Sequence, residues 1–314
     1  MPFLRRLALA PLVFLAVAAV AYGMPRILRP ELYPGEPVVT GLADDLQRAF
    51  VHFDFGCSGL LAGCPPVREL WAEGFAWDLW LMGGAVVLGT AGGIVAGRWC
   101  ARRPRSLGAR ALEAAATVGY LAPVYFVGLF TLWLFNPIYG RIPLPFFFDA
   151  EPRWVQPWNE PWDWFRQLLV PWVVAAIPLG AMCLRLTAAT TREAMQEDFI
   201  RTAAAKGVRH DEIVRRHAAP LSYPATFSFV AVSAPLVITN LVLIERVLNV
   251  PGFLRYTWRA AGHANAGDDA IPDFALLSAL TLWGALLLIV LGLIADGIVS
   301  RLDPRVRLSG GQAW

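Results

Sequence analysis

The chain has 314 residues, of which 57% are hydrophobic and only 16% are charged, and its mean hydropathy is +0.50. A soluble domain carries about 25% charged residues, so this composition excludes an ordinary soluble globular protein. The formal net charge of +3 is too small to indicate nucleic-acid binding.

Long stretches without formal charge predict membrane-spanning helices. Each has a length near the ~20 residues needed to cross ~30 Å of hydrocarbon. These stretches are residues 7–25, 79–97, 114–140, 167–184, 218–244 and 274–295. We therefore expect an all-α membrane protein with six transmembrane helices. The first stretch has an alternative interpretation as a cleaved signal peptide, because Arg5 and Arg6 precede it and small residues follow its apolar core. A span is favoured because the apolar core is long for a signal and further spans follow.

The distribution of Lys and Arg predicts the orientation. With the N-terminus inside, the inner segments hold more of these residues than the longer outer loops. Both termini and the loop over residues 190–220 are then cytoplasmic. The expected organisation is a first transmembrane helix (1–25), an extracytoplasmic segment (26–75), a five-helix core (76–303) and a cytoplasmic tail (304–314).

Small residues and cysteines add two local expectations. Gly89, Gly93 and Gly97 recur every fourth residue in the second span, a spacing that lets helices approach closely in lipid. Cys57 and Cys64 fall in the extracytoplasmic segment, where oxidation is permitted. A disulfide between them and a pair of free thiols both fit the sequence.

The loop between the fourth and fifth spans is highly charged. Eleven formal charges lie between Arg192 and Arg216, and each would cost roughly 2.5–3.5 kcal/mol at a helix centre in lipid. A capping box at Thr190 and Glu193 and a Gly at position 207 predict two short helices joined at Gly207. Their expected apolar side is formed by Phe199, Ile200, Val208, Ile213 and Val214. Such a helical pair fits either a docking element for a soluble partner or an amphipathic hairpin on lipid headgroups.

The same loop resembles the EAA loop of ABC-importer permeases, in the version found in the dipeptide/oligopeptide/nickel transport family. The matching residues are Glu193, Glu197, Asp198, Ile200, Arg201, Thr202, Ala203, Ala205, Lys206, Gly207 and His217, with Phe199 where the family has Tyr. Flanking motifs agree with the resemblance: Asp54, Gly56, Ser58 and Pro66-Val67 upstream, and Glu245, Pro251, Gly252, Arg255, Asp296 and Asp303-Pro304-Arg305 downstream. Cys57 and Cys64 are not part of this pattern.

The resemblance implies the type I ABC importer permease fold and a place in the bacterial inner membrane. The chain would form the translocation path for peptides or a related small solute. Its expected partners are a second, different permease subunit, two cytoplasmic ABC ATPase subunits that bind ATP and Mg, and an extracytoplasmic solute-binding protein. The residues that would couple the chain to the ATPases are Glu193, Glu197, Asp198, Ala203, Ala205, Lys206, Gly207 and His217.

The sequence contains no motif for a catalytic or cofactor site of its own. A Walker A motif needs Gly-Lys-[Ser/Thr], whereas Lys206, the only lysine, precedes its glycine. The four histidines lie in separate loops, without metal-ligand spacing. We therefore predict a transport subunit with no catalytic residue, no cofactor and no metal.

Polar residues in or beside the spans are candidates for function. Arg185 and Asp296 fit either an ion pair with each other or a substrate role. Glu245 fits either a gate or an ion pair with Arg246 or Arg259. The expected substrate path runs near Ser228, Ser233, Thr239 and Asn240, for which helix–helix hydrogen bonding is the alternative.

Two other classes of membrane protein would show a different distribution of polar residues. An ion-coupled secondary transporter would need charges near the midplane of several spans, and a polytopic membrane enzyme would need clustered Asp, His or Cys at one membrane face. The sequence has neither pattern.

Overall fold

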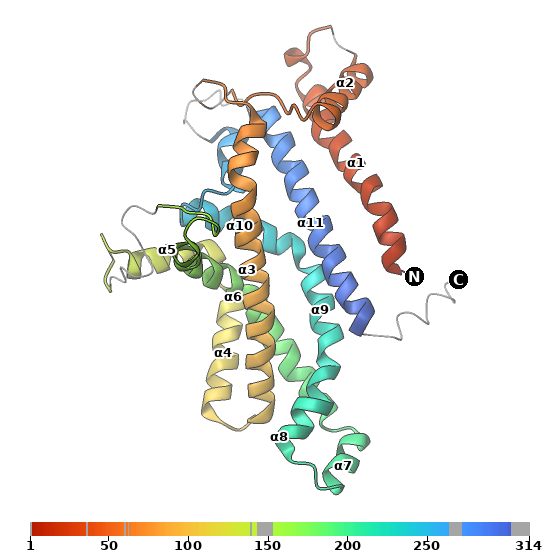
Figure 1. Ribbon diagram of the computed structural model, residues 1–314, viewed down its shortest axis with the longest axis vertical. Helices are drawn as coiled ribbons and strands as arrows, with labels where there is room; N and C mark the ends of the chain where they lie inside the picture. Colours follow the sequence, from red (N-terminus) through yellow and green to blue (C-terminus); the bar gives the residue numbers. More distant parts are fainter. Residues whose placement is uncertain are drawn as a thin grey trace. The chain divides into compact units, whose positions relative to one another are not determined.

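The computed structural model describes residues 2–35, 37–59, 61, 63–138, 140–142, 153–263 and 272–302. The tail predicted for 304–314 and the Asp303-Pro304-Arg305 motif lie outside the described residues. The elements within them are helices, with no β-strand in those ranges (Figure 1). The α-helices are α1 (Pro2–Leu28), α2 (Val38–Val51), α3 (Val67–Arg102), α4 (Leu107–Leu121), α5 (Val124–Phe135), α6 (Pro161–Ala194), α7 (Asp198–Ala205), α8 (His210–Ile213), α9 (Tyr223–Val232), α10 (Ala234–Val247) and α11 (Phe274–Leu302).

Four helices are long and apolar enough to cross a membrane without a break. They are α1, α3, α6 and α11. Two further candidates are bent pairs, α4 with α5 at 109° and the 210–232 segment with α10 at 56°. Counting each bent pair as one span gives the six that the charge-free stretches predict.

The bends have local causes. Pro123 has no backbone N–H to donate and disfavours helical geometry in the residue before it, and Ala122 accordingly has extended dihedrals (φ −70°, ψ 128°). The second break lies at Ser233, two residues before Pro235, which has no backbone N–H to donate to the carbonyl of Ala231. The length of the third and fifth apolar stretches therefore predicted where these two candidate spans lie, but not that each one is bent.

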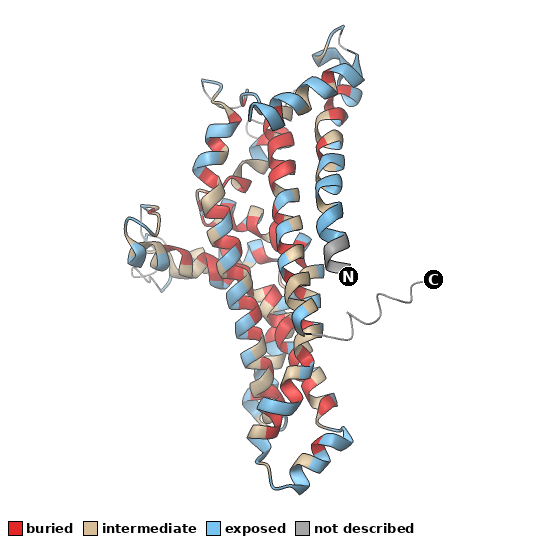
Figure 2. Ribbon diagram, turned by 45° about the vertical axis from the view of Figure 1, so that its right-hand side comes forward, coloured by how far each residue is buried: buried red, intermediate tan, exposed pale blue. Residues whose placement is uncertain are grey.

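The chain divides into two compact units, which are described separately. Unit 1 comprises residues 1–79 and 251–291, and unit 2 comprises residues 80–250 and 292–314. Burial differs sharply among the spanning helices: 67% of the apolar window of α6 is buried, against 11% for α1. Figure 2 accordingly shows exposed and intermediate residues along most of the helix at the N-terminus.

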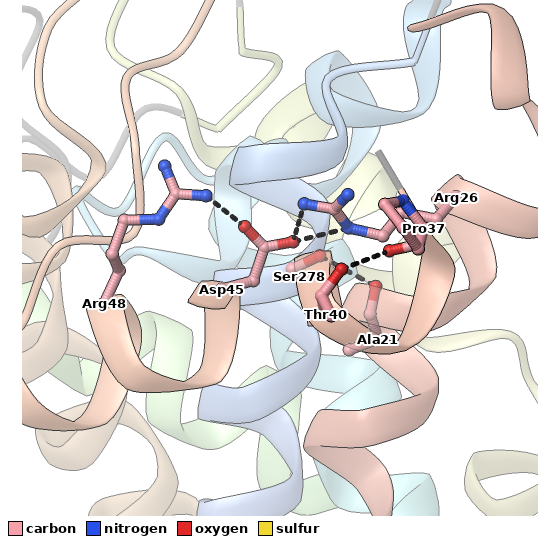
Figure 3. Close-up of polar contacts among 7 residues, drawn as sticks. All are labelled: Ala21, Arg26, Pro37, Thr40, Asp45, Arg48 and Ser278. Atoms are coloured by element: carbon pink, nitrogen blue, oxygen red, sulfur yellow. Dashed lines mark hydrogen bonds and ion pairs between the residues drawn. The ribbon is translucent and has the colours of Figure 1, made fainter. Parts of the chain in front are cut away.

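In unit 1, a buried arginine joins α1 to α2. Arg26 is 3% exposed and donates two hydrogen bonds to Asp45, at 2.8 and 2.7 Å, while Arg48 contacts the other oxygen of the same carboxylate (Figure 3). A Cβ atom at Gly41 would lie 2.1 Å from a guanidinium nitrogen of Arg26. Glycine at this position therefore lets α2 approach the buried guanidinium.

Also in unit 1, a disulfide-closed loop before α3 is hydrogen-bonded to the residue before α11. Cys57 and Cys64 are joined by a disulfide. Ser58 next to it donates a hydrogen bond of 2.7 Å to Asp273, whose other oxygen accepts from the backbone N–H of Leu276 at 3.0 Å. Asp273 thus caps the N-terminus of α11 and links it to the loop.

In unit 2, α3 and α6 pack through glycines. A Cβ at Gly93 would lie 2.6 Å from both the Cβ of Cys183 and the carbonyl oxygen of Gly180, and one at Gly97 would lie 2.6 Å from the Leu184 carbonyl oxygen. The predicted close approach of the second span is therefore confirmed, and its partner is α6. Alanines on α4 complete this core together with Cys100 and Leu184.

Candidate functional site

The charged loop of unit 2 contains two short helices joined at a glycine. α7 ends at Ala205, Lys206 follows as its C-cap, and Gly207 adopts a φ of +80° before α8 begins at His210. A positive φ is the conformation expected at a glycine helix C-terminus. The prediction of two helices joined at Gly207 is confirmed. After α8 the chain continues through a π-helical turn (Val214–Ala218) and a 3₁₀ turn (Ala219–Ser222) into α9.

The predicted capping box is wrong. Thr190 and Glu193 lie inside the last turns of α6, where the Thr190 hydroxyl donates to the Leu186 carbonyl at 2.8 Å. The spanning helix continues to Ala194, past the end of its charge-free stretch, because no Gly or Pro lies between Gly180 and Met195. α7 begins only at Asp198, where the side chain of Glu197 makes no capping hydrogen bond.

The loop has a small apolar core of its own. Ala194, Ile200, Ile213 and Ala218 are buried together, and Met195, Ala203 and Val208 pack around them. These residues come from the end of α6, from α7, from α8 and from the turn before α9. The two short helices are therefore fixed to both flanking spans by packing.

The expectation for Phe199 is wrong. It was assigned to the apolar side of the loop, but its side chain is 47% exposed, whereas that of Ile200 is 4% exposed. Adjacent residues on a helix differ by about 100° in direction, so α7 cannot bury both against one core. Phe199 instead lies on the outer surface of the loop.

Most of the predicted coupling residues are on the exposed surface. Ala203 is half-buried, and the exposed ones are Glu193, Glu197, Asp198, Ala205, Lys206, Gly207 and His217. Ion pairs on this surface are local: Arg201 lies 3.4 Å from Asp198, and Arg216 lies 3.0 Å from Glu212. The loop thus presents one exposed aromatic side chain, Phe199, and exposed charges of both signs.

Two polar contacts fix the helices that lead into the loop. Arg192, near the end of α6, forms an ion pair with Glu113 of α4. The hydroxyls of Thr187 and Thr226 are 3.3 Å apart, fully buried, and join α6 to α9. The two helices that enter and leave the loop are therefore tied to each other and to α4.

The three predicted intramembrane charges occupy different environments. Glu245 on α10 is fully buried, Asp296 on α11 is half-buried and Arg185 on α6 is exposed. Among the described residues Arg185 forms no ion pair, so the expected pair with Asp296 is not seen.

The residues expected along a substrate path are not gathered in one place. Ser233 is buried at the bend between α9 and α10 and Asn240 is half-buried, while Ser228 and Thr239 are exposed. The Thr239 hydroxyl donates to the Pro235 carbonyl of its own helix at 3.0 Å. The hydrogen bond of Thr239 is thus within its own helix. It is neither a contact with another helix nor evidence for a place on the substrate path.

Two buried acids of unit 1, Asp273 before α11 and Asp78, were not among the residues predicted from the sequence. Asp78 on α3 is fully buried, and it accepts hydrogen bonds from the backbone N–H of Phe253, at 2.8 Å, and from the indole N–H of Trp283. Its position directly before the second charge-free stretch was a signal, since an acid beside a span is a candidate for function.

A family model confirms what this arrangement of bent spans and a structured charged loop suggests. The model for binding-protein-dependent transport system inner membrane components matches residues 93–308. The chain belongs to this family. It is the permease subunit of an ABC importer in the inner membrane, a transport component rather than an enzyme.

Individual permeases of known systems are similar over most of their length. The probable peptide ABC transporter permease y4tP of Sinorhizobium fredii is 27% identical over 276 residues, which cover 85% of this permease and 82% of the relative. The dipeptide transport permease DppB of Lactococcus lactis is 25% identical over 97% of this chain and 98% of its own. The glutathione transport permease GsiC of Escherichia coli is 24% identical over 85% and 81% of the two chains.

Proposed function

We propose that this permease imports peptides or chemically related small solutes, and that the 190–220 loop is its docking element for a cytoplasmic ATPase subunit. The substrate class is supported by relatives named for peptide, dipeptide and glutathione transport. All three names refer to solutes built on peptide bonds.

The observation that carries the docking role is the two-sided structure of α7. One side, with Ile200, is buried against residues from the ends of both flanking spans, and the other side exposes Phe199 among charges. An exposed aromatic side chain on a surface that also carries charged residues is typical of a protein–protein contact. A hairpin lying on lipid would instead need several apolar side chains on its outer face.

The packing of the loop provides a route for force. A displacement of α7 acts on Ala194 at the end of α6 and on Ala218 before α9, because all belong to one packed cluster with Ile200. The Thr187–Thr226 contact keeps α6 and α9 together in this motion. ATP and Mg are bound by the ATPase subunits, and the residues of this chain act only by docking and transmitting movement.

The remaining parts of the proposal concern topology and partners. The positive-inside distribution supports cytoplasmic termini and a cytoplasmic loop. A second, different permease subunit completes the path, and a solute-binding protein delivers the solute to the outer face. Ser228, Ser233, Thr239 and Asn240 are proposed for the path, and Glu245, buried on α10, for a gate.

The docking role is tested with Phe199→Arg, which places a cation on the exposed side of α7. We expect membrane insertion to persist and the amount of co-purified ATPase to fall about thirtyfold, since an aromatic anchor contributes on the order of 2 kcal/mol. The matched control is Phe53→Arg, because Phe53 is also exposed, at 59%, but lies outside the loop. Normal co-purification and normal peptide uptake by Phe199→Arg would refute the docking role.

The substrate class is tested separately by uptake of labelled dipeptide, tripeptide and glutathione by cells that express the whole importer. Uptake of at least one of them, lost on deletion of this permease, is the expected result. Uptake of none, with ATPase binding intact, would contradict the substrate class and leave the docking role standing.

A further inference from the structure

Two cavities of unit 1 lie side by side between α1 and α11. One is polar and has a volume of about 320 Å³, and the other is apolar and has a volume of about 590 Å³. They share Pro25, Phe274 and Ser278 in their walls. From this pairing we propose that unit 1 binds one phospholipid with an ethanolamine headgroup, with its head in the polar cavity and an acyl chain in the apolar one.

The polar cavity is lined by two cations and two anions. Arg26 is buried, donates two hydrogen bonds to Asp45 and is covered by the ring of Tyr33, whose centroid lies 4.3 Å from the guanidinium carbon. Arg48 uses one nitrogen on Asp45, and its side chain is 57% exposed, so its other N–H groups face the cavity or solvent. Asp54 is exposed and accepts from the Gly56 N–H with one of its two oxygens. The charged groups still open to a ligand are therefore one cation, Arg48, and one anion, Asp54.

A tyrosine hydroxyl in the same wall lacks a partner. Tyr22 lines the polar cavity, and its hydroxyl oxygen is buried with no hydrogen-bond partner among the described residues. Buried hydroxyl groups are almost always hydrogen-bonded, because an unsatisfied one costs free energy. Phosphate or ester oxygens of a lipid would satisfy it.

The apolar cavity follows one face of α1. Val13, Val17, Val20 and Met24 line it from α1, and Leu277 lines it from α11. From Val13 to Met24 the helix rises about 16 Å, close to half of the ~30 Å hydrocarbon thickness. A gap of this kind in a bilayer is not filled by water, because its walls offer few polar partners. An acyl chain has the length and chemistry to fill it.

The charges decide which headgroup fits. A phosphate can accept from Arg48 and Tyr22, and the primary ammonium of ethanolamine can donate to Asp54. The quaternary ammonium of choline has no N–H to donate, and glycerol leaves Asp54 facing a net anion. We therefore expect ethanolamine lipids to bind in preference to choline and glycerol lipids.

The test measures phospholipid retained by the purified importer complex after exchange into nanodiscs of equal phosphatidylethanolamine, phosphatidylcholine and phosphatidylglycerol. Lipid is counted per permease by mass spectrometry after dilution into detergent. The unmodified complex should retain phosphatidylethanolamine selectively. Arg48→Gln should lower the retained amount about tenfold, and Tyr22→Phe, which conserves the fold, should lower it less.

Two matched controls separate the site from general effects. Arg29→Gln changes an arginine of similar exposure, 51%, that does not line the cavity. Val20→Trp fills the apolar cavity, whereas Leu12→Trp alters a residue of the same 65% exposure on α1 outside it. Arg29→Gln and Leu12→Trp should retain the lipid, and Val20→Trp should lose it.

Three results would overturn the proposal. One is equal retention of the three lipids by the unmodified complex. Another is equal retention by Val20→Trp and Leu12→Trp. The third is complete displacement of the bound phosphatidylethanolamine by water-soluble glycerophosphoethanolamine at the same concentration. The acyl chain would then contribute nothing to the binding affinity.

Discussion

The carboxylate of Asp78 on α3 accepts a hydrogen bond from the backbone N–H of Phe253, 2.8 Å away and 175 residues later in the chain. Phe253 directly follows Pro251 and Gly252, the pair that the sequence resemblance had marked. The turn approaches α3 so closely that a Cβ at Gly74 would lie 2.4 Å from the Phe253 nitrogen. Asp78 and Gly74, one turn apart on α3, therefore position this turn together.

Replacing Asp78 with Ala should destabilise the permease by about 2–4 kcal/mol, because two buried donors, the Phe253 N–H and the Trp283 indole, lose a charged acceptor. The measurement is the midpoint of thermal unfolding of the detergent-solubilised complex. Asp44→Ala removes an exposed acid on α2 and serves as the control. Equal midpoints for the two variants would contradict the role assigned to Asp78.

Gly93→Ala should lower stability by about 1–3 kcal/mol, because the added methyl group would lie 2.6 Å from Cys183 and from the backbone of Gly180. The neighbouring Gly92 has no atom within 4 Å of an added Cβ. Gly92→Ala should therefore leave stability unchanged or raise it by up to about 1 kcal/mol, because alanine favours a helix more than glycine does. The pair can be compared by the fraction of protein that remains monodisperse in size-exclusion chromatography after heating. If both variants behave alike, α3 and α6 do not approach as closely as described.

Only two of the four cysteines should react with maleimide after denaturation without reductant, and all four after reduction. Cys57 and Cys64 are joined by a disulfide, while Cys100 and Cys183 are buried free thiols. Replacing both Cys57 and Cys64 with Ser should cost about 2–3 kcal/mol, since the disulfide closes a short loop in the unfolded chain. Labelling of four thiols without reductant would show that the disulfide does not form in the cell.

Gly207→Val should uncouple peptide uptake from ATP hydrolysis while leaving insertion intact. No atom lies within 4 Å of a Cβ at this position, so the effect comes from the backbone, whose φ is +80°. A β-branched residue in this conformation costs roughly 1–2 kcal/mol, whereas Asn adopts it more readily. Gly207→Asn should therefore retain most of the uptake per ATP hydrolysed in proteoliposomes. Unchanged coupling in Gly207→Val would count against the loop as the transmission element.

Features that depend on neighbours in the chain were predictable. Apolar length located the four long spanning helices and the two bent pairs, glycines at every fourth residue predicted a close helix contact, and Gly207 marked the junction of two short helices. The capping box at Thr190 failed although it too is a local signal, because a continuous spanning helix competes with it and ends only at Ala194.

The amino-acid sequence by itself determined the class of the protein, its spans and the position of its charged loop, because these follow from the free energy of placing each residue in lipid or water. Only the tertiary structure decided that Phe199 faces outward, that Asp78 holds the turn at Phe253 and that Arg26 is buried against Asp45. Such pairings depend on which surfaces of distant segments meet, and no period or spacing along one segment encodes its partner in another.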